Sequence, residues 1–420
     1  MTRRTKMLLV VGLGFVFIPA CLAAQGAISL PATGQTVLYH SGDDGDLMKG
    51  VAWPVPRFVD NGDGTITDNL TKRIWLKNGN CPNATGNWQT ALQDVAELNS
   101  SGTMNGNDCG DTSNGGSHQS DWRLPNVLEL ESLMNVGEDN TGSWLQGQGF
   151  ENIPYNVGGF VERYWSSTTY QTDVGDNREH AWTVEITDER VRHEDKASTS
   201  RYIWAVRGNE PAPADLWRTG QTTQYAAGDD GAYQLGVPSP SPRFVDSGKG
   251  TVFDLLSGLV WLRTAECAQV QVHWVTALQY VGELNTSGTM NGNDCGDTSN
   301  SGTHQTDWRL PNRKELLSLI DYGDINPALP SGYPFTNVDP GHWYWSSSTF
   351  GTSNNAFTMS IGSGSRSDDD KDTEVDSVWA VRGPVNAARV IPAASTSGLA
   401  GLALLLAIVG AILVFRWRAG

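Results

Sequence analysis

The chain has 420 residues, 39% of them hydrophobic, which suffices for two or three globular domains. Its formal net charge of −17 argues against binding nucleic acid or sulfated polysaccharide through net attraction. That charge fits an exported domain, a cationic ligand or divalent ions. The 47 glycines, with frequent Asn, Asp, Ser and Thr, indicate many turns and argue against a helical bundle.

Residues 1–24 have the pattern of a secretory signal peptide. Three basic residues precede the apolar run 7–18, and small residues follow as far as Ala24. This order predicts export, with cleavage after Ala23 or Ala24. A lipoprotein is the alternative, because the residues before Cys21 approach a lipobox, although Pro19 fits that pattern poorly.

The rest of the chain is a tandem repeat. The string SGTMNGNDCGDTSN occurs at 101–114 and again at 287–300, and further motifs recur at the same offset of 186 residues. A repeat of this length is a whole domain rather than a solenoid unit. We predict two homologous domains, 30–208 and 217–383, joined by the Pro-rich linker 209–216.

Each repeat predicts an α+β domain with two early helices and later antiparallel strands. In the first repeat, an Asn-Gly and Asp-Gly turn between alternating runs at 57–59 and 65–67 predicts a β-hairpin. Apolar residues at three-to-four spacing predict a helix across 88–98. Asn126 followed by Glu129 has the spacing of a capping box and predicts a second helix. Further strands are predicted at 73–76, 164–167, 181–186 and 202–207.

Four cysteines remain after the predicted signal, two in each repeat, and the members of each pair lie 28 positions apart. An even number of cysteines in an exported chain implies disulfides. We therefore predict Cys81–Cys109 and Cys267–Cys295. A metal site would need closer ligand spacing or a nearby pair of histidines, and a redox motif would need C-x-x-C.

The hairpin of the first repeat contains candidate calcium ligands. Asp60, Asp63 and Asp68 lie in a glycine-punctuated, oxygen-rich loop of the kind that binds calcium in exported proteins. The alternative is an ordinary hairpin turn, because Asn and Asp side chains also bond turn backbone. In the second repeat Lys249 replaces Asp63, which weakens the site there.

The repeated loop and two tryptophans supply the other candidates for ligand binding. Asn105, Asn107, Asp108 and Asp111 are the polar loop residues to test first, although turn chemistry favours a structural role for this loop. Most tryptophans alternate with small or polar residues and are expected in the core. Trp144 and Trp343 are predicted to lie in loops and are the better surface candidates.

The string DWRLPN occurs in both repeats, and a histidine, His118 or His304, precedes it at the equivalent place. His118 could pair with Asp121, but no nucleophile motif such as G-x-S-x-G and no H-E-x-x-H is present in the sequence. We instead expect Asp121 and Asp307 to bond local backbone, and Arg123 and Arg309 to bind a carboxylate.

The C-terminus predicts a membrane anchor. Residues 398–415 are apolar or small and just long enough to span a bilayer, and the basic tail 416–420 suits the cytoplasmic side. With the linker 384–397, which contains Ile391 and Pro392, this end resembles the IPTL-CTERM sorting signals, although three positions after Pro392 depart from that pattern. The resemblance implies a Gram-negative envelope protein that sorting machinery processes.

Four motifs, found in order in both repeats, resemble the Lcl C-terminal domain family. In the first repeat they are RFVDNGDGTITDNLT (57–71), DWRLPNVLELESL (121–133), YWSST (164–168) and WAVRG (204–208). The resemblance implies a C-type-lectin-like fold, related to formylglycine-generating enzymes, in each repeat. Members of the family are exported, and the best-known contains a polysaccharide-binding adhesin domain. The sugar-binding signatures of C-type lectins, however, are absent from the sequence.

We therefore expect a non-enzymatic, exported protein that is anchored in the envelope or displayed at the surface. Its expected partner is an extracellular ligand, with polysaccharide as the first class to test, and calcium as the candidate cofactor. An enzyme on the formylglycine-generating fold and a structural surface-layer component are the alternatives. No nucleic-acid partner is expected.

Overall fold

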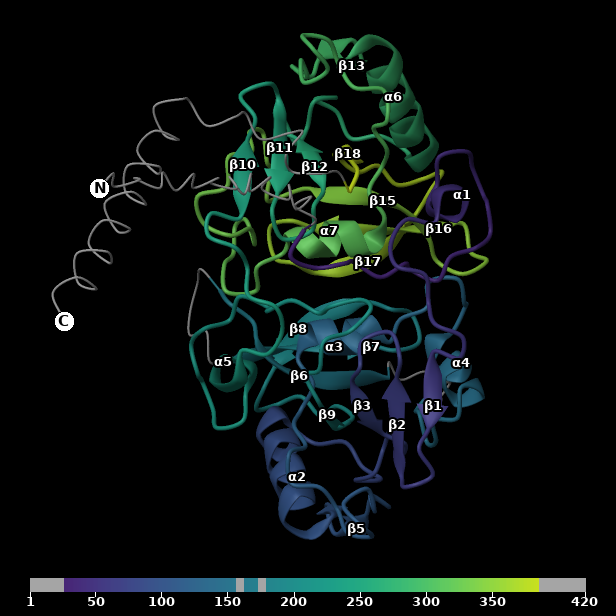
Figure 1. Cartoon of the computed structure of the whole chain (residues 1–420), viewed down its shortest axis with the longest axis vertical. Coiled ribbons are helices and arrows are strands. Elements are labelled where there is room, and N and C mark those ends of the chain that lie inside the picture. Colours follow the sequence, from purple (N-terminus) through teal and green to yellow (C-terminus); the bar gives the residue numbers. More distant parts are fainter. Residues whose placement is uncertain (1–25, 156–161, 173–178, 385–420) are drawn as a thin grey trace, which may run out of the picture.

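The computed structural model describes residues 26–155, 162–172 and 179–384 (Figure 1). The predicted signal peptide and the predicted anchor at 398–415, with its sorting motif, lie outside these ranges. Within them, no helix is both long and apolar enough to cross a bilayer. The two repeats form two halves of mixed α and β structure, stacked along the longest axis of the molecule.

The elements of the two repeats follow nearly the same order. The first repeat contains α1 (Asp44–Leu47), β1 (Phe58–Asp60), β2 (Thr65–Asp68), β3 (Ile74–Leu76), α2 (Trp88–Ser101), β4 (Thr103–Met104), β5 (Asn107–Asp108), α3 (Val127–Ser132), α4 (Thr141–Gly147), β6 (Arg163–Thr169), β7 (His180–Glu185), β8 (Val191–Asp195) and β9 (Val206–Arg207). The second contains α5 (Asp230–Tyr233), β10 (Phe244–Asp246), β11 (Thr251–Asp254), β12 (Val260–Leu262), α6 (Trp274–Ser287), β13 (Thr289–Met290), β14 (Asn293–Asp294), α7 (Arg313–Leu319), β15 (Trp343–Thr349), β16 (Asn355–Ser360), β17 (Arg366–Asp370) and β18 (Val381–Arg382).

The predicted hairpin and both predicted helices are confirmed. Strands β1 and β2 pair antiparallel across the Asn-Gly and Asp-Gly turn. Helix α2 buries its apolar stripe. Its N-cap is Asn87, whose side chain accepts a hydrogen bond from the Thr90 N–H, and its C-cap is Gly102, which has the left-handed conformation. Helices α3 and α7 both begin with a complete capping box from Asn to Glu.

The segment 202–207 is only partly a strand, because it passes between two sheets. Tyr202 forms a bridge with Tyr164 of the large sheet, whereas Val206 pairs with Trp75 of the small sheet β1-β2-β3-β9. The residues in between are fully buried, and the Trp204 Nε1–H donates to the Leu76 carbonyl at 2.8 Å. The prediction of one continuous strand was therefore wrong at its first four residues.

A single six-stranded sheet joins the two halves. Its order is β15-β16-β17-β8-β7-β6, and β8 meets its counterpart β17 antiparallel, with Val191 opposite Arg366. Because equivalent strands meet at the centre, the two repeats are related by an approximate two-fold axis there. The sheet therefore makes the two domains one continuous structure.

The segment that opens each repeat crosses to the other domain. We call residues 26–49 strap 1 and residues 212–235 strap 2. Helix α1, in strap 1, lies against β15 of the second domain, and α5, in strap 2, lies against β6 of the first (Figure 1). The sequence repeats and the folded units therefore differ, because each folded unit contains the other repeat's strap.

Matching hydrogen bonds hold the two straps. The Asp44 carboxylate of strap 1 accepts from Ser348 Oγ at 2.6 Å, and the Thr349 N–H donates to Gln35 Oε1 at 2.7 Å. In strap 2, Asp230 accepts from Thr168 Oγ1 at 2.7 Å, and Gln221 Oε1 accepts from the next N–H at 2.6 Å. The exchange is thus reciprocal and uses equivalent positions in both directions, with the hydroxyl donor a serine in one domain and a threonine in the other.

Between the domains lies a buried ion cluster whose charges differ between the repeats. Glu131 of α3 accepts from Arg313 at 3.0 Å and from Arg366 at 2.6 Å, and its Oε2 lies 3.6 Å from Lys314 Nζ. Glu189 accepts from Arg313 at 2.7 Å. The side chains in these ion pairs are at most 4% exposed.

The equivalent positions of the other repeat are apolar. Val127 and Leu128 stand where the second domain has Arg313 and Lys314, and Leu317 stands where the first has Glu131. The acids of the cluster thus come from one domain and the bases from the other. Each domain is therefore complementary in charge to the other domain and not to a second copy of itself.

The first prediction concerns this cluster. Replacing Glu131→Gln leaves buried cations without their shared acid, so we expect the free energy of unfolding to fall by roughly 3–5 kcal/mol. Urea denaturation at pH 7 measures this change. The exposed Glu138→Gln is the control and should stay within about 0.5 kcal/mol of the parent. Equal stability of both variants would contradict the assigned role of Glu131.

The same cluster predicts a pH dependence. Burial alone raises the pKa of Glu131, but Arg313, Arg366 and Lys314 outweigh it and hold the pKa at about 2, below the ordinary value of 4.5. The folded state therefore binds fewer protons than the unfolded state between these values. The stabilisation is complete above pH 4.5 and is lost as the pH falls towards 2.

Denaturation of the parent and of Glu131→Gln at a series of pH values tests this dependence. The difference between their unfolding free energies should be constant from pH 7 to about pH 5 and should shrink steadily below that. A difference that does not change with pH would show that Glu131 is not ionised in the folded protein.

Candidate functional site

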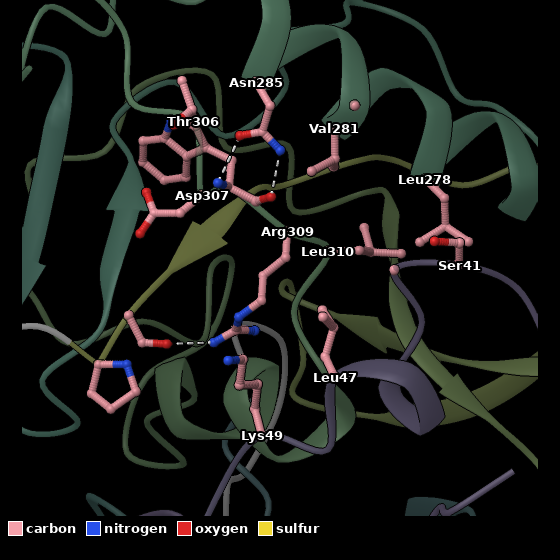
Figure 2. A pocket seen from close by; sticks show the side chains of 15 residues that line it. Ser41, Leu47, Lys49, Leu278, Val281, Asn285, Thr306, Asp307, Arg309 and Leu310 are labelled. Atoms are coloured by element: carbon pink, nitrogen blue, oxygen red, sulfur yellow. Dashed lines mark hydrogen bonds between the residues drawn. The ribbon is translucent and has the colours of Figure 1, made fainter. Parts of the chain in front are cut away.

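A pocket of about 590 Å³ lies between strap 1 and helix α6 of the second domain (Figure 2). Strap 1 contributes Leu47 and Lys49, and α6 contributes Leu278 and Val281. Segment 306–310 and the end of the described chain at Pro384 complete the lining. Both repeats therefore supply walls of the pocket, which the sequence reasoning did not foresee.

The side chain of Asn285 on α6 holds the backbone of segment 306–310, which forms one side of the pocket. Its Nδ2–H donates to the Trp308 carbonyl and its Oδ1 accepts from the Trp308 N–H, both at 2.8 Å (Figure 2). Asn99 and Trp122 form the same pair of bonds in the first domain. This clamp sets the directions in which the neighbouring Asp307 and Arg309 leave the chain.

Arg309 and Asp307 each form an ion pair with a residue of opposite charge. Arg309 forms an ion pair with the buried Glu315 and donates to the Gly383 carbonyl at 2.9 Å. This confirms that Arg309 binds a carboxylate, as Arg123 does with Glu129. Asp307, however, accepts from Arg382 at 2.6 Å and not from local backbone.

The expectation for Asp121 is corrected in the same way. Its Oδ1 accepts from Arg207 Nε at 2.7 Å, so it binds the arginine of the WAVRG motif rather than backbone of its own loop. His118 packs against Gly102 at the end of α2. The structure shows no hydrogen bond between the His118 side chain and Asp121.

Lys49 differs from the other charged residues of the pocket. Its carbonyl accepts from Asn312 Nδ2 at 3.3 Å, which fixes the backbone, but its exposed ammonium has no partner among the described residues. Lys49 and Arg309 both line the pocket (Figure 2). The pocket thus contains one positive charge that no described acid neutralises.

Most polar side chains of the repeated loop are engaged in holding the loop itself. Asn105 and Asn107 both donate to the Pro82 carbonyl, at 3.1 and 2.9 Å. Asp108 accepts from the Gly110 N–H at 2.9 Å, while its side chain stays exposed. These bonds fit the structural role that turn chemistry favoured.

Asp111 is the most engaged residue of the loop. Its two oxygens accept from Ser113, from the Gln119 N–H and from Trp122 Nε1, the last at 2.8 Å. Asp297 repeats these bonds in the second domain. The buried Asp111 therefore anchors the segment that leads into DWRLPN.

Both predicted disulfides are confirmed. Each joins the repeated loop to the segment that precedes the long helix of its domain, α2 or α6. Cys81 bonds Cys109 with Cα atoms 5.3 Å apart, and Cys267 bonds Cys295 with Cα atoms 5.4 Å apart. In both pairs the cysteines are 28 residues apart in sequence. The letter-for-letter repeat thus marks the same stapled loop in two domains.

Asp60, the first candidate calcium ligand, is paired with a lysine. Lys77 Nζ lies 2.9 Å from Asp60 Oδ2 and 2.9 Å from Glu151 Oε1. A shallow cleft of about 340 Å³ brings these residues together with Asp108. In the second domain Arg263 lies 3.3 Å from Asp246, so a basic side chain holds this position in both copies.

The other two candidate ligands have separate partners. Asp63 accepts from the N–H and the hydroxyl of Thr65, as in a turn. Asp68 is buried and forms an ion pair with Arg57 at 3.2 Å. Within the described residues no group of three or more metal-ligating side chains could hold an ion. The predicted calcium site thus has no shared ligand set there.

The two tryptophan candidates lie in regular structure rather than in loops. Trp144 is part of α4 and is half-buried, with its ring 5.6 Å from Trp53 and 5.7 Å from Phe58. Trp343 is the first residue of β15 and is also half-buried. Trp144 thus contributes to packing, and neither ring lines the pocket at strap 1.

A histidine that the sequence analysis did not single out lies in another cleft, of about 450 Å³. His342 Nδ1 lies 2.8 Å from Glu266 Oε1, and Ser377 Oγ donates to the same oxygen at 2.7 Å. A hydrogen bond from His342 to Glu266 raises the pKa of the histidine. Ser377 is buried, and its Oγ also lies 3.3 Å from His342 Nδ1, so the three side chains form one hydrogen-bonded cluster.

The fold and the sites define a protein of two fused, disulfide-stapled α+β domains with a preformed pocket at a strap. A family model of the Lcl C-terminal domain matches residues 64–207 and 250–382. Since these stretches cover more than half of the chain, it belongs to the Lcl C-terminal domain family, with two copies of the domain. A comparison with curated proteins found no match.

The third prediction concerns the staples. Replacing Cys81→Ser together with Cys109→Ser opens a loop of the first domain, so we expect unfolding free energy to fall by roughly 3–4 kcal/mol in the chain-entropy model. The same double change at Cys267 and Cys295 is the matched comparison and should cost about as much, because the geometry is the same. An unchanged denaturation midpoint in either variant would contradict this expectation.

Proposed function

We propose that this chain is an exported recognition protein, anchored in the envelope or displayed at the surface, that binds an extracellular ligand through its paired Lcl C-terminal domains. Glycans are the first ligand class to test, because the lectin-like fold expected from the family is often used for recognition. Fold kinship alone does not identify a ligand.

The observation that supports this proposal most is the pocket at strap 1. Its volume of about 590 Å³ falls in the range of small-molecule sites, and its walls come from both repeats. The two disulfides also fit an oxidising compartment outside the cytoplasm.

The alternative of a formylglycine-type enzyme has less support. Such an enzyme needs reactive cysteines, and all four cysteines in the described part of the chain are joined in disulfides. A thiol titration of the purified protein that found reactive cysteines would favour the enzyme again.

The fourth prediction tests recognition directly. The full chain, labelled and solubilised in mild detergent, should bind a defined subset of a glycan array or a host-cell surface with saturation. Binding should survive removal of calcium by a chelator, because the carboxylates of the hairpin have protein partners. The same chain after reduction and unfolding is the control. No saturable binding to glycans, cells or matrix proteins would contradict the proposal.

A further inference from the structure

We propose that the pocket at strap 1 binds a small amphipathic anion, namely an apolar group that carries a carboxylate, and that the first domain has no equivalent site. This inference rests on the proposed recognition function, because it names the ligand class of the same pocket. It follows from the lining of the pocket, from its charge and from the differences between the repeats.

The walls of the pocket favour an apolar group. Leu47 of strap 1 lines the pocket together with the apolar side chains of Leu278, Val281, Leu310 and Pro384. The amide of Asn285 already uses one N–H and one acceptor position in its two bonds to Trp308, so less of its hydrogen-bonding capacity remains for a polyhydroxylated ligand. Burying an apolar group against these side chains supplies most of the binding energy.

The charge of the pocket favours a single anionic group. Asp307 is paired with Arg382, and Arg309 is paired with Glu315, so these residues contribute little net charge. Lys49 remains, with an ammonium that no described acid contacts. A carboxylate placed between Lys49 and Arg309 would gain a charge-assisted hydrogen bond at the rim while its apolar part lies inside.

The same arrangement disfavours a densely charged polymer. The chain as a whole carries a formal charge of −17, so a sulfated or polyphosphate ligand is repelled beyond the immediate surroundings of Lys49. A ligand with one negative charge and an apolar group is subject to less of this repulsion. The pocket is therefore matched to a monoanion.

The first domain lacks the features that make this pocket. Leu235 of strap 2 stands where strap 1 has Lys49. Arg73 and Asn209 stand where the second domain has Leu259 and Pro384, and Arg73 donates to Asn209 at 3.0 Å. The first domain thus lacks the free cation and has a polar bridge where the second domain has apolar side chains. One site is therefore expected per chain.

Calorimetric titration of the full chain with matched probes tests the proposal. Octanoate represents a free acyl chain, and N-acetyl-leucine represents an apolar residue at the carboxyl end of a peptide. Octanamide and N-acetyl-leucinamide are the neutral partners of the two acids. We expect at least one acid to bind about tenfold more tightly than its amide, with one site per chain. Which acid binds identifies the source of the carboxylate.

Lys49→Leu, which copies the residue of strap 2, should abolish the preference for the acid while leaving weak binding of the apolar part. Lys249→Leu removes an exposed lysine elsewhere and should change nothing. Because Lys49 is exposed, its replacement leaves folding intact, and denaturation midpoints verify this. Equal affinity for acid and amide, an unaffected preference in Lys49→Leu, or two equal sites per chain would overturn the proposal.

The probe titrations and the glycan and cell-surface assay together separate this inference from the proposed function. If the full chain binds glycans or cells but none of the four probes, the ligand class assigned to the pocket is wrong and recognition stands. If the acids bind as expected and no extracellular surface is recognised, the pocket is a ligand site but the proposed function fails.

Discussion

The charges buried between the two domains constrain the rest of the structure. Arg313 and Arg366 lie in an interior without solvent, where an unpaired cation costs several kcal/mol, and the acid that both of them contact, Glu131, belongs to the other repeat. The six-stranded sheet, the reciprocal straps and the pocket all presuppose that the first domain faces the second. A pairing of two identical domains would put two acids, or two sets of bases, together at the same place.

This asymmetry explains how a duplicated chain obtains a single site. Strap 1 and strap 2 use the same Asp and Gln contacts to reach the opposite domain, so the scaffold is symmetric. The residues that follow those contacts have diverged, with Lys49 in one strap and Leu235 in the other. Duplication supplied two copies of a frame, and a few substitutions inside the frame made the copies chemically different.

Local features of the fold could be predicted from the sequence, whereas the relation between the domains could not. The hairpin, helix α2, the capping boxes and the disulfides depend on neighbouring residues or on simple counting, so periodicity and spacing were sufficient. The exchange of the straps depends on which of two nearly identical partners a segment contacts, and local pattern does not contain that information. The sequence did contain a signal for the interface. VLELESL and RKELLSL differ at three positions, and at each of them one repeat has a charged residue where the other has an apolar one. That difference can be interpreted only once β8 and β17 are known to meet. Lys49 lies in an irregular segment where no periodicity marks a site.

The reciprocal straps also bear on the order in which such a chain folds as it is synthesised. Strap 1 is made early, yet its partners Ser348 and Thr349 lie more than three hundred positions later and are made near the end. The first domain likewise needs Asp230 of the following repeat before its own sheet is covered. Neither half can reach its final form before the other has been synthesised, so a chain interrupted near the linker would leave strap 1 and the sheet of the first domain without their partners.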